Sequence, residues 1–315
     1  MNWRSSCELS VGLTARRSPS LNEGDQQTSL LMRNHSTVAR FVLVLLAIGA
    51  LQLLVARARA EEITVKEDKF KSGTATIKVL RFDAPGEGKR PVVILLHGAD
   101  GWSASPMAGL RFAAAGINAT GHTAVLIRYF DRTNTPDKIP ADQRGDFVRW
   151  LRGDASNEKE NTSRKHFEQW METVRDAVRY VRELPNVDAN RVAIAGFSLG
   201  GYLALSAAPT CDPPINAVVE MFGGLPEEYR KKLGKMPPTL IVHGEEDDVV
   251  SVNEAYRAAG VILAQKQHIV IEIHKGVGHV CCPPGKETPD FIELNKARNH
   301  MTSFLKKQLE PERKK

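Results

Sequence analysis

Short apolar runs alternate with amphipathic helical patterns along most of this 315-residue chain, and that alternation limits the possible folds more than any other feature. The run Val92 to Leu96 (VVILL) is typical of a strand that is buried on both faces of a sheet. Similar runs predict further strands at Thr123 to Ile127, Val192 to Ala195, Ala217 to Phe222, Thr239 to Val242 and Ile269 to Ile273.

Two segments keep one apolar stripe at steps of three and four residues, as an amphipathic helix does. The earlier stripe comprises Phe167, Trp170, Met171, Val174, Val178 and Val181. The later stripe comprises Phe291, Leu294, Ala297, Met301, Phe304 and Leu305. Pro185 ends the earlier helix. Strands that alternate with helices predict an α/β fold, with one mostly parallel sheet and helices on both faces.

The stretch from Asp131 to Lys165 interrupts this alternation. It is polar and rich in charge, and it contains Pro136 and Pro140. Long loops without regular structure are uncommon unless they serve a function or are mobile. Two interpretations of this polar insertion (131–165) stay open. It is either a lid over a functional site or a solvated insertion.

The N-terminal region carries the features of a targeting segment. Phe41 to Ala56 contains no charge, Arg33 and Arg40 precede it, and Ala58-Arg59-Ala60 follows it. A basic flank, an apolar centre and an A-x-A site are typical of a secretory signal peptide, and a membrane span needs about 20 apolar residues. We therefore expect cleavage after Ala60. The alternative is an uncleaved membrane anchor formed by residues 41–56.

Residues 1–31 are polar and without periodicity, whereas Met32 would begin a compact targeting segment. We therefore expect the true start at Met32. Residues 1–60 then comprise a prefix and a signal peptide, and we expect residues 61–315 to form one domain. An exported protein, periplasmic or secreted, is the expected location.

The net charge of +6 comes mostly from the N-terminal region. Residues 1–60 contain seven Arg and three acidic residues, so residues 61–315 carry a net charge of only +2. This balance argues against nucleic acid as a partner.

Cys211, Cys281 and Cys282 are the cysteines of the expected domain. In an exported protein Cys211 could form a disulfide with Cys281 or Cys282, and such a bond would hold the neighbouring loop. Free thiols are the alternative. The spacing does not fit a metal site.

Ser198 lies in the segment Gly196-Phe197-Ser198-Leu199-Gly200-Gly201, directly after a predicted strand. Glycines two residues before and after a serine permit the tight turn from strand to helix that exposes the serine oxygen above a sheet. The helix that follows directs its positive N-terminus toward this oxygen. The pattern predicts a nucleophile.

A serine nucleophile needs a base, and the base needs an acid that orients it. In the fold with this turn, the chain order is serine, acid, histidine. Asp247 follows one predicted strand and His279 follows the next, so parallel pairing would bring both to the same edge of the sheet. Glu246 and Asp248 are alternative acids. The histidines at or within strands are weaker bases, namely His243, His268 and His274.

An oxyanion at the reacting carbonyl needs backbone N–H donors. In such sites one donor is the residue after the nucleophile, here Leu199, and the other comes from the loop after the third strand. That loop is His97-Gly98-Ala99-Asp100-Gly101-Trp102. We expect the second donor to be the N–H of Ala99, with Gly98 the alternative.

The motifs LLHGADG, YFDRT, AIAGFSLGGYLAL, PPTLIVHGEEDDVV and HKGVGH together resemble those of the dienelactone hydrolase family. The resemblance runs from about Ile77 to Leu309 and implies the α/β-hydrolase fold. It also implies the nucleophile, acid and base at Ser198, Asp247 and His279, and oxyanion donors at Ala99 and Leu199.

Two departures affect the expected substrate. Founding members of the family use cysteine as nucleophile, where this chain has Ser198, and carry a glutamate where it has Gly98. The family's carboxylate-binding arginines have no secure match, although Arg128 and Arg132 are nearby. We therefore expect a serine esterase that acts through an acyl-enzyme on a small carboxylic ester. An acyltransferase or peptidase with the same residues, or a non-catalytic binding protein with this fold, is the alternative.

No motif for a metal, nucleotide or flavin is present, so no cofactor is expected. The sequence leaves open the acyl and alcohol groups of the substrate and the oligomeric state.

Overall fold

The computed structural model describes residues 65–310, with gaps at 154–157, 284 and 287. The proposed start, signal peptide, cleavage site and anchor lie outside these residues. Within them, no helix is both long and apolar enough to cross a membrane.

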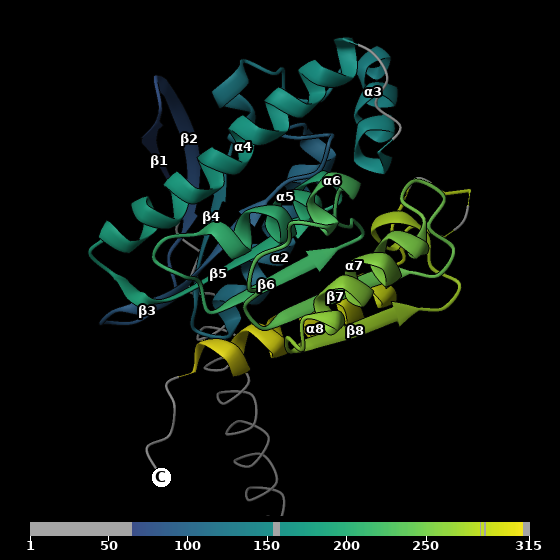
Figure 1. Cartoon of the computed structure of the whole chain (residues 1–315). Coiled ribbons are helices and arrows are strands. Elements are labelled where there is room, and N and C mark those ends of the chain that lie inside the picture. Colours follow the sequence, from purple (N-terminus) through teal and green to yellow (C-terminus); the bar gives the residue numbers. More distant parts are fainter. Residues whose placement is uncertain (1–64, 154–157, 284, 287, 311–315) are drawn as a thin grey trace, which may run out of the picture. The chain divides into compact units, whose positions relative to one another are not determined.

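The described chain is built around an eight-stranded sheet with the order β1-β2-β4-β3-β5-β6-β7-β8 (Figure 1). Strands β3 to β8 run parallel to one another. Their bounds are Arg90–Leu96 (β3), Thr123–Ile127 (β4), Val187–Phe197 (β5), Ala217–Met221 (β6), Thr239–Gly244 (β7) and Ile269–His274 (β8). Each of the six strands expected from apolar runs is present, which confirms the mostly parallel sheet.

A hairpin at one edge of the sheet was not expected. β1 (Val65–Ser72) pairs antiparallel with β2 (Ala75–Phe82), and β2 pairs antiparallel with β4. β1 is mostly polar and exposed because it lies at the edge of the sheet, so it lacks the continuous apolar run of a buried strand. Gly73 closes the hairpin with φ of 52°, a conformation that favours glycine.

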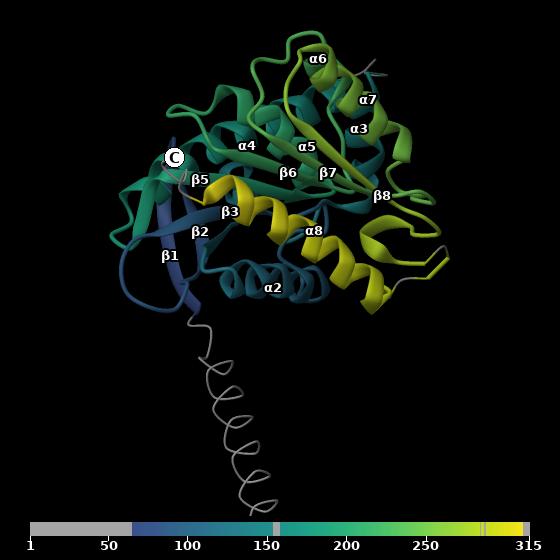
Figure 2. The ribbon, with the colours of Figure 1, turned by 90° about the horizontal axis from the view of Figure 1, so that it is seen from below.

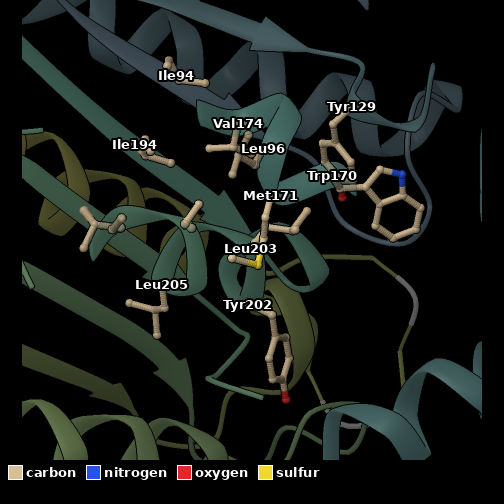
Figure 3. Close-up of a cluster of buried hydrophobic side chains, with 14 of the residues drawn as sticks. Ile94, Leu96, Tyr129, Trp170, Met171, Val174, Ile194, Tyr202, Leu203 and Leu205 are labelled. Atoms are coloured by element: carbon tan, nitrogen blue, oxygen red, sulfur yellow. The ribbon is translucent and has the colours of Figure 1, made fainter. Parts of the chain in front are cut away.

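Helices cover both faces of the sheet, as the alternating pattern predicts. Figure 2 shows α2 (Ala104–Ala119) and α8 (Phe291–Leu309) together on one face. The opposite face packs against α4 (Glu158–Glu183), α5 (Leu199–Ala207) and α7 (Val252–Ala264). Figure 3 shows Trp170, Met171 and Val174 of α4, which belong to the core on this second face. Short helical segments complete the chain at η1 (Tyr129–Thr133), η2 (Ala208–Thr210), α6 (Glu227–Arg230) and η3 (His279–Cys281).

The polar insertion contains a packed helix. α3 (Ala141–Arg152) buries Phe147 and Trp150, although its other residues are mainly polar. Phe147 stacks on Trp170 with ring centroids 5.4 Å apart, and Trp150 lies 4.8 Å from Phe167. α3 is therefore not merely solvated, because one of its faces packs into the core of the domain while the other is exposed.

Of the two alternatives for the cysteines of the domain, the structure has the free thiols. Cys211, Cys281 and Cys282 are all free thiols. Cys211 is buried in the core on the α4 and α5 face, whereas Cys281 is buried in the core on the α2 and α8 face. The sheet therefore separates Cys211 from Cys281.

Candidate active site

Ser198 occupies the turn between β5 and α5 in a conformation that few non-glycine residues adopt. Its φ is 54° and its ψ is −118°. The turn is held by N–H groups of Gly201 and Tyr202, which donate to the Ser198 carbonyl oxygen at 2.8 and 3.2 Å. Strain of this kind persists only where the surroundings enforce it, and it is common at functional sites.

The glycines around Ser198 are required by contacts between backbones. A Cβ atom at Gly196 would lie 2.0 Å from the carbonyl oxygen of Gly200, and one at Gly200 would lie 2.4 Å from that of Leu96. Neither position has room for a side chain. The glycine spacing in the sequence therefore reflects a real steric need of this turn.

His279 connects Ser198 to Asp247. Its Nε2 lies 3.1 Å from Ser198 Oγ, and its Nδ1 lies 2.8 Å from Asp247 Oδ2. The three residues follow β5, β7 and β8, whose carboxyl ends meet at one edge of the sheet. The structure thus brings together the three side chains that the sequence singles out as nucleophile, acid and base.

Asp247 is the acid of its loop that points inward. It is 7% exposed, whereas Glu246 and Asp248 are exposed. Its Oδ1 accepts hydrogen bonds from the N–H groups of Val249 and Val250, at 3.0 and 2.8 Å. Burial alone would raise the pKa of Asp247, but hydrogen bonds from His243 and His279 hold it well below the usual range. Asp247 is therefore an anion that can support a positively charged His279.

The other histidines have different surroundings. His243 is fully buried against the loop that follows β7. Its Nε2 lies 2.8 Å from the Val250 carbonyl oxygen and 3.3 Å from Asp247 Oδ2. His274 pairs with Glu293, and His268 is exposed. None of the three contacts Ser198 among the described interactions.

His97 orients the peptide bond between Gly98 and Ala99. The Gly98 carbonyl oxygen accepts from His97 Nδ1 at 2.9 Å and from the Gly101 N–H at 3.0 Å. A trans peptide points its N–H opposite to its C=O, so these bonds aim the Ala99 N–H away from His97. Because a carbonyl oxygen only accepts, His97 Nδ1 carries the proton, and burial lowers the pKa of His97 to about 4.

The same loop lies against the nucleophile. A Cβ atom at Gly98 would be 3.2 Å from Ser198 Cβ and 3.7 Å from Ser198 Oγ. The N–H of Leu199 belongs to the first turn of α5, where backbone N–H groups lack partners within the helix. Ala99 and Leu199 are thus on segments that adjoin Ser198, as the sequence predicts for oxyanion donors.

Sequence reasoning missed His97 and its aromatic support. The His97 ring stacks on Tyr129, with centroids 4.0 Å apart, and the Tyr129 hydroxyl donates to the His97 carbonyl oxygen at 2.7 Å. Histidine directly before a glycine-rich loop is the only sequence signal for this role, and the partner lies 32 residues away.

Arg128 and Arg132 are engaged by the protein itself. Arg128 forms ion pairs with Asp131 and Asp137. Arg132 pairs with Glu172 and donates to the Ser72 carbonyl oxygen. Because both guanidinium groups already pair with carboxylates of the protein, both are poor matches for the family's carboxylate-binding arginines.

Among the described residues, no cluster of histidine, cysteine and acidic side chains could hold a metal ion. The arrangement at Ser198 offers instead a hydroxyl, an imidazole and a buried carboxylate in series. Such a series can activate the hydroxyl for attack on a carbonyl carbon.

Comparisons with known proteins identify the family. The model of the dienelactone hydrolase family matches residues 78–309. Among curated proteins, acyl-protein thioesterase 1 of Gibberella zeae is 25% identical over 128 residues, which are 38% of this chain and 49% of that protein. Esterase YpfH of Escherichia coli is 26% identical over 109 residues, 35% of this chain and 47% of that protein. The chain thus spans about half the length of the curated relatives it matches.

Solved structures share the fold at low identity. A dienelactone-hydrolase-like promiscuous phosphotriesterase from metagenomic libraries is 18% identical with a TM-score of 0.61, over 78% of this chain and 99% of that one. Dienelactone hydrolase from Anabaena variabilis is 17% identical with a TM-score of 0.56, over the same shares. Esterase 2 from Thermogutta terrifontis is 16% identical with a TM-score of 0.57, over 80% and 98%. These likenesses establish the α/β-hydrolase fold.

Proposed function

The chain belongs to the dienelactone hydrolase family, and from that premise we propose that it is a serine hydrolase that cleaves carboxylic esters through an acyl-enzyme. The observation that carries this proposal is the continuous hydrogen-bonded series from Ser198 through His279 to Asp247.

In the first half of the proposed reaction, Ser198 Oγ attacks the ester carbonyl carbon while His279 Nε2 takes the hydroxyl proton. The negative charge that develops on the carbonyl oxygen is stabilised by the N–H groups of Ala99 and Leu199. Asp247 stabilises the positive charge on His279. Collapse of the tetrahedral intermediate breaks the ester bond, and His279 gives its proton to the departing alcohol.

In the second half, a water molecule attacks the acyl group on Ser198 and transfers a proton to His279. The second tetrahedral intermediate releases the carboxylic acid and returns the proton to Ser198. No cofactor enters either half. Since Arg128 and Arg132 are paired within the protein, we favour esters whose acyl group is uncharged over substrates held by a carboxylate.

The decisive experiment is labelling with a fluorophosphonate probe together with a panel of esters of graded acyl length. The wild-type protein should be labelled at Ser198 and hydrolyse at least one ester. Ser198→Ala should abolish labelling and lower kcat by several orders of magnitude. Ser206→Ala is the matched control, because Ser206 is a buried serine on α5 that bonds to the Tyr202 carbonyl oxygen.

A folded wild-type protein that neither reacts with the probe nor hydrolyses any ester would contradict the proposal. Competing alcohols and amines in the same assay separate hydrolysis from acyl transfer, because a transferase forms a new ester or amide. A peptide panel tests the peptidase alternative in the same way.

Export is a separate proposal that rests on the sequence of residues 1–60. N-terminal sequencing of the protein produced in its natural host should find Glu61 as the first residue. Recovery of the uncleaved N-terminus would contradict it.

A further inference from the structure

Glu220 is a buried carboxyl group that the proposed reaction does not use. It lies in β6 within the run Ala217–Met221, and its exposure is 0%. Its neighbours in this strand are apolar, and the strand is buried on both faces. Because an unneutralised carboxylate is strongly disfavoured in such surroundings, its retention here needs a reason.

The carboxyl group of Glu220 closes a tight turn beside the nucleophile. Its Oε1 accepts from the N–H of Gly223, and its Oε2 has no partner among the described residues. The turn encloses Phe222, whose φ of 57° lies in the left-handed region. A bulky residue rarely adopts this conformation unless other contacts enforce it, and the bond from Glu220 to Gly223 spans it.

Phe222 in turn packs beside the proposed base. Its ring is 1% exposed and meets the His279 ring edge-on, with centroids 6.1 Å apart and planes at 76°. Its N–H donates to the Val242 carbonyl oxygen at 2.9 Å. The turn that Glu220 closes therefore places the Phe222 ring against His279, whose imidazole contacts Ser198.

Glycines let the carboxyl group approach the nucleophile turn. A Cβ at Gly201 would lie 3.1 Å from Glu220 Oε1, and a Cβ at Gly223 would lie 2.6 Å from the Ser198 carbonyl oxygen. A negative charge on Glu220 would thus lie close to the N-terminal turn of α5, the same positive helix end that should stabilise the oxyanion.

The charged and titratable groups that interact with Glu220 come from β7, from the loop after it and from α5. His243 at the end of β7 and Asp247 after it both interact with its charge. Tyr202 on α5 interacts with Glu220 and with Glu254 of α7, which is itself paired with Arg230. Burial raises the pKa of Glu220 to about 7, although His243 opposes this rise. Its charge therefore changes within the range in which enzymes are assayed.

We propose that Glu220 is a positioning residue, which holds the Phe222 turn against His279 and which slows the reaction when it becomes ionised. This inference rests on the proposed serine hydrolase function. The hydrogen bond is made by either form of the carboxyl group, since Oε1 accepts in both. Only the ionised form places a negative charge against the first turn of α5, where it weakens the positive helix end that should stabilise the developing oxyanion.

The first test compares the pH dependence of kcat/KM in wild type and Glu220→Gln, since glutamine can still accept from Gly223. For the wild type we expect kcat/KM to fall about tenfold between pH 6.5 and 8.5, as Glu220 becomes ionised. Glu220→Gln should lose this fall. The exposed Glu183 supplies the control, because Glu183→Gln should reproduce the wild-type profile.

The second test separates position from charge. Glu220→Leu removes both the acceptor and the charge, so the Phe222 turn should relax and kcat should fall about tenfold or more with little change in KM. Glu220→Gln keeps the acceptor, so at low pH its kcat should be equal to that of the wild type. Equal kcat in the leucine and glutamine variants, or an unchanged alkaline limb in Glu220→Gln, would overturn the inference.

A readout without substrate distinguishes this inference from the proposed function. Because the folded pKa of Glu220 is raised, its contribution to stability is complete at low pH and is lost as pH rises through about 7. The Tm of the wild type should therefore decline from pH 5 to 8 relative to Glu220→Gln. Ester hydrolysis that depends on Ser198, with identical Tm profiles for the two proteins, would overturn the role of Glu220 alone. Tm profiles that differ, in a protein that hydrolyses no ester, would overturn the proposed function and the kinetic role of Glu220. They would still support the ionisation of the buried Glu220 near pH 7.

Discussion

Two buried carboxyl groups lie at the ends of neighbouring strands, and they differ in what surrounds them. Asp247 accepts hydrogen bonds from two backbone N–H groups and from His279, with His243 close by. Glu220 accepts from one N–H group, and its second oxygen has no partner in the described structure. The pKa of Asp247 is lowered, whereas burial raises the pKa of Glu220 to about 7. Burial raises the pKa of both, and only Asp247 has the hydrogen-bond donors and the neighbouring imidazoles that bring its pKa down again.

Two carboxyl groups with pKa values pushed apart can take different roles in one site. Asp247 suits a permanent negative charge that orients His279. Glu220 suits a group whose charge is absent when the site works and appears as pH rises. The following predictions test this division.

The largest effect should come from removing the charge of Asp247. Asp247→Asn keeps the size of the side chain but cannot orient and stabilise a protonated His279, so kcat should fall by about ten-thousand-fold. Asp248→Asn, which alters the exposed neighbour, should change kcat little. The measurement is steady-state hydrolysis of the best ester in the panel. A large loss in Asp248→Asn and a small one in Asp247→Asn would reverse the assignment.

That assignment also shows how far sequence alone reaches. Chain order and strand ends predict that Ser198 and His279 lie together, as they do, because parallel strands gather their ends at one edge. The choice among four consecutive acids, Glu245 to Asp248, depends on which side chain turns inward. The sequence favours Asp247 without excluding its neighbours, and in the structure it is Asp247 that turns inward and accepts from the N–H groups of Val249 and Val250.

Glu220 and His97 were missed for a different reason. A single glutamate inside an apolar run looks like an imperfection of a buried strand, and its hydrogen-bond donor is a backbone N–H, that of Gly223, which the sequence does not distinguish from any other. A charged residue within a strand buried on both faces is nevertheless a sequence signal in its own right. The β1–β2 hairpin was missed because an edge strand is polar, and α3 because only a few of its residues are apolar.

The second prediction concerns His243, which interacts with both carboxyl groups. Although burial opposes it, the hydrogen bond with Asp247 and the charge of Glu220 raise the pKa of His243. His243→Phe should leave Asp247 with one imidazole partner and lower kcat about tenfold, through a disturbed Asp247 rather than through substrate contacts. His268→Phe, at an exposed histidine, is the control. An unchanged kcat for a folded His243→Phe would show that the two carboxyl groups act independently.

The third prediction uses stability, where the two groups should act with opposite sign. The folded pKa of Asp247 is lowered, so its contribution is present above its unfolded pKa of about 4 and is lost as pH falls below that value. The wild type should therefore lose Tm between pH 5 and 3 more steeply than Asp247→Asn. Thermal unfolding by circular dichroism checks this. Parallel Tm curves for the two proteins on the acid side would mean that Asp247 is not a stabilised anion.

The smallest effect should come from an exposed carboxylate that forms an ion pair. Asp100 follows Ala99 and pairs with Arg144, and the two side chains are 55% and 41% exposed. Exposed ion pairs contribute about 0–1 kcal/mol, so Arg144→Gln should change kcat less than about threefold and leave the Tm nearly unchanged. The loop has stronger supports, because the Ile139 N–H donates to the Ala99 carbonyl oxygen at 2.9 Å and the Trp102 N–H donates to that of Asp137 at 2.7 Å.

A loss of tenfold or more in kcat for Arg144→Gln would mean that the polar insertion controls the oxyanion loop through this surface pair. It would also mean that pairing alone, without burial, is enough to make a carboxylate matter in this site. The comparison of Asp247 with Glu220 attributes the effect of each carboxyl group to its burial. That explanation would then have to be replaced.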